Sequence, residues 1–218
     1  MPPRPSRNLD RALIAAGREL LPLRGCAGIT IREVCEAAGV NPGMFHYHFR
    51  TREAFLRALL QHTYEDMFVH VTLVSGHDVG PVHNLRAALR VLGRFLRDHR
   101  AFISRVLADS LCGDAIATAL LCENMPRHLT LLQGLIAHAQ ETGELRRMPV
   151  PQAIGVCAGS IAAPILFAGA IEGERAGKAL ARGLVSDAAI DERIDLALRA
   201  LAPDGEPRRA KPAARRRA

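Results

Sequence analysis

Residues 29–56 read ITIREVCEAAGVNPGMFHYHFRTREAFL and contain the start and stop signals of two short helices. Thr30 and Glu33 form a capping box, in which the Thr hydroxyl accepts from the third amide and the Glu carboxylate reaches back to the cap. Gly39 follows as a residue that tolerates positive φ and commonly ends helices. This arrangement predicts a first short helix between the capping box and the glycine.

A second short helix is predicted to begin at Pro42. Asn41 is a favoured N-cap, and proline suits the first helical turn because no backbone N–H is needed there. This helix closes at Phe49, and Thr51 caps a longer helix after it. Two short helices joined by a tight turn form a helix-turn-helix, whose second helix enters the DNA major groove. The small Gly43 at its start would let the backbone approach the bases.

The composition predicts an all-α protein. Hydrophobic residues make up 49% and charged residues 23% of the 218-residue chain, as in soluble globular proteins, and strand-favouring residues are sparse. Before the motif, one helical face is expected from Leu9, Leu13, Ala16, Leu20 and Leu23, ahead of breaks at Gly25 and Gly28. After the motif, helices are expected from residue 52 through the 60s and over 85–96, 102–111, 115–122, 126–141, 152–170 and 188–201.

Positive charge is concentrated at the two ends of the chain, whose formal net charge is +7. Residues 1–62 contain nine Arg and five acidic residues, and residues 203–218 contain six Lys or Arg and two acidic residues. Each end is therefore basic by four charges, whereas residues 63–202 are nearly neutral. A compact basic head indicates a polyanionic partner, and a near-neutral body argues against a membrane-surface protein.

Several functional classes have no support in the sequence. The five Cys are an odd number without a C-x-x-C pair, and the nine His are scattered without H-E-x-x-H. Because G-x-S-x-G, a phosphate loop and a dinucleotide fingerprint are also missing, we expect no metal, no cofactor and no enzymatic activity. The start of the chain has no apolar signal segment, and the apolar run at 155–171 is short for a membrane span. We therefore expect a cytoplasmic protein that does not associate with membranes.

Residues 29–56 closely resemble the TetR family of bacterial transcriptional regulators, through Ala37-Ala-Gly-Val40, Pro42-Gly43, Tyr47-His48-Phe49 and Arg52. The family usually has Thr or Ser in place of Met44 and Tyr in place of His46, so the resemblance does not identify the operator sequence. The resemblance is close over about residues 7–67 and continues to about residue 202 as a layout of helices. The domains expected are a flexible lead-in at 1–6, a three-helix DNA-binding domain at 7–67 with its motif at about 30–49, a helical ligand-binding and dimerisation domain at 68–202, and a disordered basic tail at 203–218.

The resemblance implies roles for the residues of the motif. Thr30 and Arg32 would touch phosphate or groove edges, and residues 41–44 would face bases. The polar residues at 46–48 and the basic residue that starts the next helix would lie at phosphates. The residues expected to contact DNA are Thr30, Arg32, Asn41, Gly43, Met44, His46, Tyr47, His48 and Arg52.

The resemblance also implies that the helical body binds a small molecule and forms a homodimer. The helix at 152–170 is rich in Gly, Ala and Ser, and with 188–201 it could form half of a four-helix interface. Ligand would favour a dimer geometry that no longer fits DNA, so the expected function is a repressor released from a palindromic double-stranded DNA operator by a hydrophobic or amphipathic effector. The candidate cavity residues are Phe95, His99, Phe102, Val106, Met125, Leu129 and Phe167.

Three points remain open at this level. The competing hypothesis is a helical protein-interaction module that does not bind DNA. Cys112 and Cys122 are either structural thiols or a thiol sensor, and each aromatic residue assigned to the cavity is otherwise ordinary core.

Overall fold

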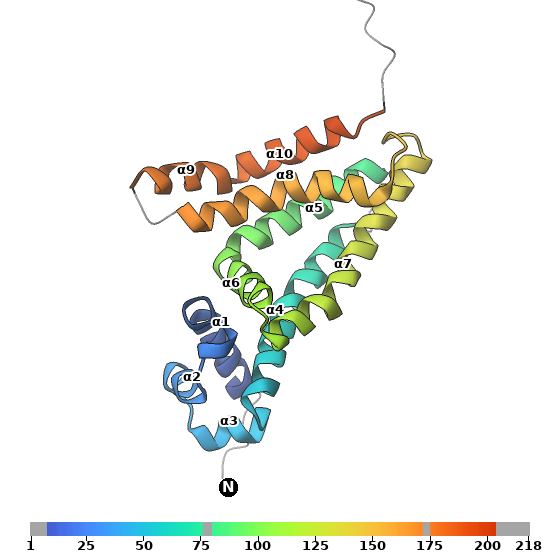
Figure 1. The fold of residues 1–218 in the computed structure, drawn as a ribbon. Helices are drawn as coiled ribbons and strands as arrows, with labels where there is room; N and C mark the ends of the chain where they lie inside the picture. Colours follow the sequence, from blue (N-terminus) through green and yellow to red (C-terminus); the bar gives the residue numbers. More distant parts are fainter. Residues whose placement is uncertain (1–7, 76–79, 172–174, 204–218) are drawn as a thin grey trace, which may run out of the picture.

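The computed structural model describes residues 8–75, 80–171 and 175–203, and within these ranges the chain forms helices and no strand (Figure 1). The all-α prediction is therefore confirmed for this part of the chain. The expected lead-in at 1–6 and all but the first residue of the expected tail lie outside the described residues. The helices are α1 (Asn8–Gly28), α2 (Ile31–Ala38), α3 (Pro42–Phe49), α4 (Arg52–Ser75), α5 (Pro81–Asp98), α6 (Arg100–Leu111), α7 (Ala115–Glu141), α8 (Val150–Ile171), α9 (Arg175–Val185) and α10 (Asp187–Ala200).

Local hydrogen bonds define α2 and α3 as the sequence predicts. The Thr30 hydroxyl accepts from the Glu33 amide at 3.2 Å, and the Glu33 carboxylate accepts from the Thr30 amide at 3.2 Å. Gly39 ends α2 in the left-handed conformation with φ of 64°. The Asn41 side chain then accepts from the Gly43 amide at 2.8 Å and starts α3. The helix-turn-helix geometry is confirmed at both of its caps.

The first hydrophobic core joins α1, α2, α3 and the first half of α4 around Phe45 and Phe55, which are fully buried. The same core continues into α6 and α7, because Phe102 and Val106 pack against it. The expected stripe of α1 ends early. At Gly25 the backbone turns to φ 72°, ψ 172°, and in the turn before this kink Leu21 is buried whereas Leu23 is exposed.

A second core joins α5, α7, α8 and α10 around side chains such as Leu85, Ile136 and Ile190. In Figure 1, α8, α9 and α10 form a layer at the opposite end of the molecule from α2 and α3. Ion pairs between α5 and α10 align these helices along their length. They join Arg86 to Asp195, Arg90 to Asp191 at 2.8 Å, and Arg97 to Asp187.

Two helices differ from the sequence expectations. Residues 115–141 form one helix rather than two, with Pro126 inside it. Pro126 is exposed, so the carbonyl of Cys122 that it leaves without a donor can face water. Packing against α4, α5, α6 and α8 holds both halves of α7 in line. The helix α9 was not expected at all, and it packs mainly against α8.

The helix α8 is apolar on both its inner and outer sides. Its residues 150–169 are long and apolar enough to cross a membrane by length and composition alone. Cys157 and Ile165 are buried in the second core, whereas Gly155, Gly159 and Phe167 are exposed. A helix with one side in a core and an apolar opposite side is suited to a contact with another protein surface.

Candidate nucleic-acid interface and internal cavity

The outer face of α3 is open to a large partner. Gly43 is exposed at the start of this helix, and a Cβ there would meet only the Asn41 side-chain oxygen, at 3.2 Å. Tyr47, one turn further along, is 69% exposed. The helices α2 and α3 form the end of the molecule farthest from α8–α10 (Figure 1). This end can therefore enter a groove without obstruction from the body.

Two residues of the first short helix and its cap lie beside this face. Arg32 is exposed and paired with Glu36 at 2.8 Å, an i,i+4 pair that a stronger anionic partner can replace. The Thr30 hydroxyl donates to the Glu33 carboxylate at 2.8 Å and thereby holds the pKa of that carboxyl below its usual range. Glu33 in turn pairs with Arg24 at 2.9 Å. The cap is thus a closed local network with its outer side exposed.

Arg52 has a structural role that the sequence did not indicate, and its expected contact with phosphate stays a prediction. Its guanidinium donates to the carbonyls of Cys26, Ala27 and Ile29, with distances of 2.8 Å to Ala27 and 2.7 Å to Ile29. These carbonyls lie at the kinked end of α1 and just after it, where helical partners run out. A long flexible side chain turns to whichever acceptors are nearest, so spacing along the sequence did not reveal this structural role.

Three more residues expected to contact DNA differ in how far their side chains are exposed. Met44 is half-buried and packs against the first core, so it does not present an open apolar face to bases. Nε2 of His48 is buried without a hydrogen-bond partner in the described part of the chain. His46 is exposed, with Nδ1 3.0 Å from the carbonyl of Arg50. Arg50 itself is exposed beside α3 with φ of 61°, and the sequence analysis did not select it.

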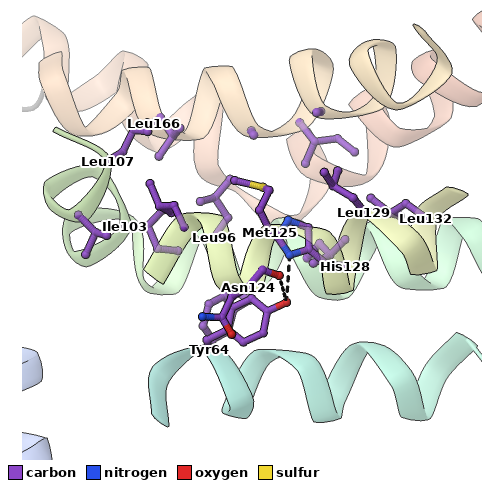
Figure 2. A pocket seen from close by; sticks show the side chains of 18 of the residues that line it. Tyr64, Leu96, Ile103, Leu107, Asn124, Met125, His128, Leu129, Leu132 and Leu166 are labelled. Carbon is purple, nitrogen blue, oxygen red and sulfur yellow. Dashed lines mark hydrogen bonds between the residues drawn. The ribbon is translucent and has the colours of Figure 1, made fainter. Parts of the chain in front are cut away.

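A cavity of about 430 Å³ lies between α4, α5, α6, α7 and α8. This volume is typical of small-molecule sites. Five of the seven residues expected there line it, namely Phe95, Phe102, Val106, Met125 and Leu129. Leu96, Leu107 and Leu166 complete its apolar walls in Figure 2.

The other two expected residues do not line the cavity. His99 lies between α5 and α6, where its ring stacks on Phe95 with centroids 4.0 Å apart and its Nδ1 is 3.0 Å from the Phe95 carbonyl. Phe167 is 56% exposed on the outer side of α8. Its neighbour Leu166 lines the cavity instead, because successive residues of a helix point about 100° apart.

One small polar cluster interrupts the apolar wall (Figure 2). Tyr64 of α4 donates its hydroxyl proton to the Asn124 carbonyl of α7 at 2.7 Å, and the same oxygen lies 3.2 Å from Nδ1 of His128. Burial raises the pKa of Tyr64 and lowers the pKa of His128, so both side chains are uncharged near neutral pH. This cluster could not be predicted from the sequence, since its members come from distant positions and match no spacing motif.

The nearest charges lie outside the cavity lining. Arg127 stacks over the Phe68 ring at 4.2 Å and the Tyr64 ring at 5.4 Å, and it pairs with Glu65. The donated hydrogen bonds from Arg127 hold the pKa of Glu65 below its usual range. Among the described residues that line the cavity, none is a Lys, Arg, Asp or Glu.

The sequence is similar to those of known bacterial regulatory proteins. Residues 13–59 match the model of the bacterial regulatory proteins of the tetR family. The HTH-type transcriptional repressor DhaR of Mycobacterium sp. (strain GP1) is 27% identical over 141 residues, which are 64% of this chain and 71% of DhaR.

Solved structures share the fold over nearly the whole chain. The transcriptional regulator FadR of Bacillus subtilis, solved in complex with stearoyl-CoA, has a TM-score of 0.69 at 15% identity and covers 86% of this chain and 97% of its own. The ketosteroid transcriptional regulator KstR2 of Mycobacterium tuberculosis has a TM-score of 0.69 at 14% identity. The match covers 91% of this chain and 97% of KstR2. At these identities the likeness concerns the fold alone.

Proposed function

We propose that this chain, whose residues 13–59 match the tetR family model, is a DNA-binding regulator of that family and represses transcription until an apolar small molecule binds the cavity between α4 and α8. The repressor assignment is supported by the similarity to DhaR, which is named a repressor. The cavity is the observation that carries the ligand response. Its apolar walls and single polar cluster are the usual makeup of a small-molecule site.

The proposed DNA contacts are those whose geometry leaves them available. Gly43 and Tyr47 present the outer face of α3, and Arg32 is an exposed cation beside it. The revised set is Thr30, Arg32, Asn41, Gly43, His46, Tyr47 and Arg50, without Met44, His48 and Arg52.

The helix α4 supplies a physical link between the cavity and DNA. Its first half belongs to the core of α1–α3, and its Tyr64 lies in the cavity wall, bonded to α7. A ligand that alters the α4–α7 contact therefore shifts α3 relative to the body. The shift acts as a switch only if the ligand binds the DNA-free geometry more tightly than the DNA-bound one.

We further propose a two-fold dimer through the outer sides of α8 and α10. Phe167 and Leu196 are large apolar residues exposed there, and Gly155 and Gly159 allow close approach of a second helix. Two α3 helices in such a dimer would read half-sites about 34–36 Å apart on a palindromic operator. The same contact would cover the apolar side of α8, which suits a cytoplasmic protein better than a membrane span.

The proposed function can be tested by selection of bound fragments from the source genome. We expect a palindromic site, bound tightly at low salt and released by an apolar compound that also raises the melting temperature. Tight binding that no apolar compound reverses would contradict the ligand response. Retention of no fragment at all would contradict operator binding.

A further inference from the structure

His128 has one ring nitrogen committed and one available. Nδ1 lies 3.2 Å from the Tyr64 hydroxyl oxygen. Figure 2 shows the other nitrogen, Nε2, directed away from Tyr64 towards the cavity interior, beside Met125 and Leu129. Within the described part of the chain, the hydrogen bond of the His128 ring is the one at Nδ1. A ligand in the cavity would therefore meet this atom as an unpaired polar group.

The hydrogen-bond chain determines which nitrogen of His128 bears the proton. A tyrosine hydroxyl has a single proton, and Tyr64 donates it to the Asn124 carbonyl, which can only accept. The Tyr64 oxygen must then accept from His128, so the imidazole proton is on Nδ1. A neutral imidazole has one proton, which makes Nε2 an acceptor. Burial lowers the pKa of His128 and keeps the ring in this neutral form.

The remaining hydroxyl of the lining is fully used. Thr63 donates to the Leu59 carbonyl at 3.0 Å and accepts from Arg18 at 3.1 Å. With the Tyr64 proton also committed, the described part of the lining offers no free hydroxyl donor. One of the two Asn124 amide hydrogens donates to the Leu120 carbonyl at 3.0 Å. His128 contributes an acceptor, Nε2, to this polar cluster.

Resting on the ligand-responsive cavity of the proposed function, we propose that the ligand is an uncharged, mainly hydrocarbon alcohol or phenol whose hydroxyl donates to Nε2 of His128. A ketone or ether would set lone pairs against this nitrogen and leave it unpaired. A carboxylate would be buried without a free cation, because Arg18 and Arg127 lie outside the lining and are paired with Asp66 and Glu65.

Matched probes separate these ligand classes. The compounds are 4-butylphenol, 4-butylanisole, 4-butylbenzoate and butylbenzene, titrated calorimetrically into the full-length chain. They share an alkyl-substituted ring and differ in the polar end. We expect the phenol to bind about tenfold or more tightly than the anisole and the benzoate, because only the phenol satisfies the buried acceptor.

Two cavity variants and one control test the proposed hydroxyl anchor, which is the hydrogen bond from the ligand hydroxyl to Nε2 of His128. H128F should lower the affinity for 4-butylphenol to that for butylbenzene and leave the affinity for butylbenzene unchanged. Y64F releases the constraint on the imidazole proton, so Nε2 can also donate, and the preference for the phenol over the anisole should shrink. The control is H138F, which removes an exposed histidine of the same helix outside the cavity. A merely structural role for His128 would instead weaken all four compounds alike.

The outcomes distinguish this inference from the proposed function. Equal binding of phenol, anisole and butylbenzene, or tightest binding of the benzoate, would overturn the hydroxyl anchor while leaving the cavity a ligand site. If no probe bound and none released DNA, the ligand-responsive function would fail together with the anchor. A phenol preference abolished by H128F and kept in H138F supports both.

Discussion

Asp109 of α6 accepts a hydrogen bond from the backbone N–H of Cys26 in α1, with nitrogen and oxygen 2.6 Å apart. Its other carboxylate oxygen accepts from Arg105 at 2.9 Å. A Cβ at Gly25 would lie 2.1 Å from the Arg105 guanidinium, and its φ of 72° also favours glycine. One carboxylate thus connects the kink of α1 to α6 in the helical body.

Replacement of Asp109 should therefore weaken communication as well as stability. D109A leaves the Cys26 amide without its partner, which costs about 1–3 kcal/mol. At about 2–4 °C per kcal/mol for a chain of this size, the melting temperature should fall by several degrees. Ligand affinity should stay unchanged, whereas ligand-induced release of DNA should need more ligand. The control is E141A, an exposed carboxylate at the end of α7. Normal release in D109A would show that this contact does not transmit the signal.

Replacement of Arg52 and of Arg32 by alanine should distinguish an arginine that stabilises the fold from one that contacts DNA. R52A removes the donors to carbonyls of residues 26, 27 and 29, so its melting temperature should fall. R32A should leave the melting temperature unchanged, weaken binding to all DNA sequences, and lower the slope of log K against log salt by about 0.9. Thermal melts and anisotropy titrations at several salt concentrations measure both effects. A normal melting temperature in R52A with a reduced salt slope would restore it as a phosphate contact.

Gly43 should be needed for DNA and not for folding. G43Q adds a side chain where only the Asn41 oxygen is near, and glutamine is the better helix former, so the fold should be retained. The new side chain would occupy the space that the bases need, and operator affinity should fall at least tenfold. G134Q is the matched control, because Gly134 is also helical and exposed with nothing within 4 Å. Equal operator affinity of the two variants would remove Gly43 from the interface.

The sequence predicts the DNA-binding half better than the body for a physical reason. The helix ends of the motif depend on interactions within a few residues, so the sequence alone can predict them. These are the capping box at Thr30, the left-handed Gly39 and the Asn41 cap. The polar cluster of the cavity instead joins Tyr64 to His128, which are 64 residues apart, and no local sequence pattern predicts that contact. Five of the seven expected residues still line the cavity, because cavity and core use the same inward faces of the helices.

The differences also have specific causes. The contacts of Arg52 with the end of α1 were not foreseen, because position along a motif does not determine where a long side chain turns, and its phosphate role stays a prediction. The α7 helix was divided at Pro126 because local propensity ignores the packing that holds it straight. Phe167 was placed in the cavity although it lies on the other side of α8, since an all-apolar helix has no polar stripe to orient it.

The five thiols should fall into distinct reactivity classes. Burial and the nearby Asp109 raise the pKa of Cys26 to about 12, and burial raises the pKa of Cys157 to about 11. Burial also raises the pKa of Cys35, whereas Cys112 and Cys122 are exposed. At pH 8 a disulfide reagent such as DTNB should therefore titrate two thiols quickly and all five after unfolding. Fast reaction of a third thiol would show that one of the buried sites opens readily.

The proposed dimer predicts the effect of charge on the outer side of α8 and α10. Phe167 and Leu196 are 56% and 51% exposed in the single chain, so glutamate at either position should leave the fold of the chain intact. In a dimer the same charge would be buried without a partner, at a cost of several kcal/mol. F167E and L196E should therefore sediment as monomers with an unchanged helical spectrum.

The matched control for these variants is L111E. Leu111 is 81% exposed at the end of α6, a helix that the proposed contact does not include, so its replacement by glutamate should leave the dimer intact. Glutamate at Ala162 or Ile165 would be less informative, because Ala162 lines the cavity and Ile165 is buried within the single chain. Both interface monomers should also lose tight binding to a palindromic operator while still binding a half-site weakly. If F167E and L196E sedimented as dimers, the two-fold contact would have to lie on another face.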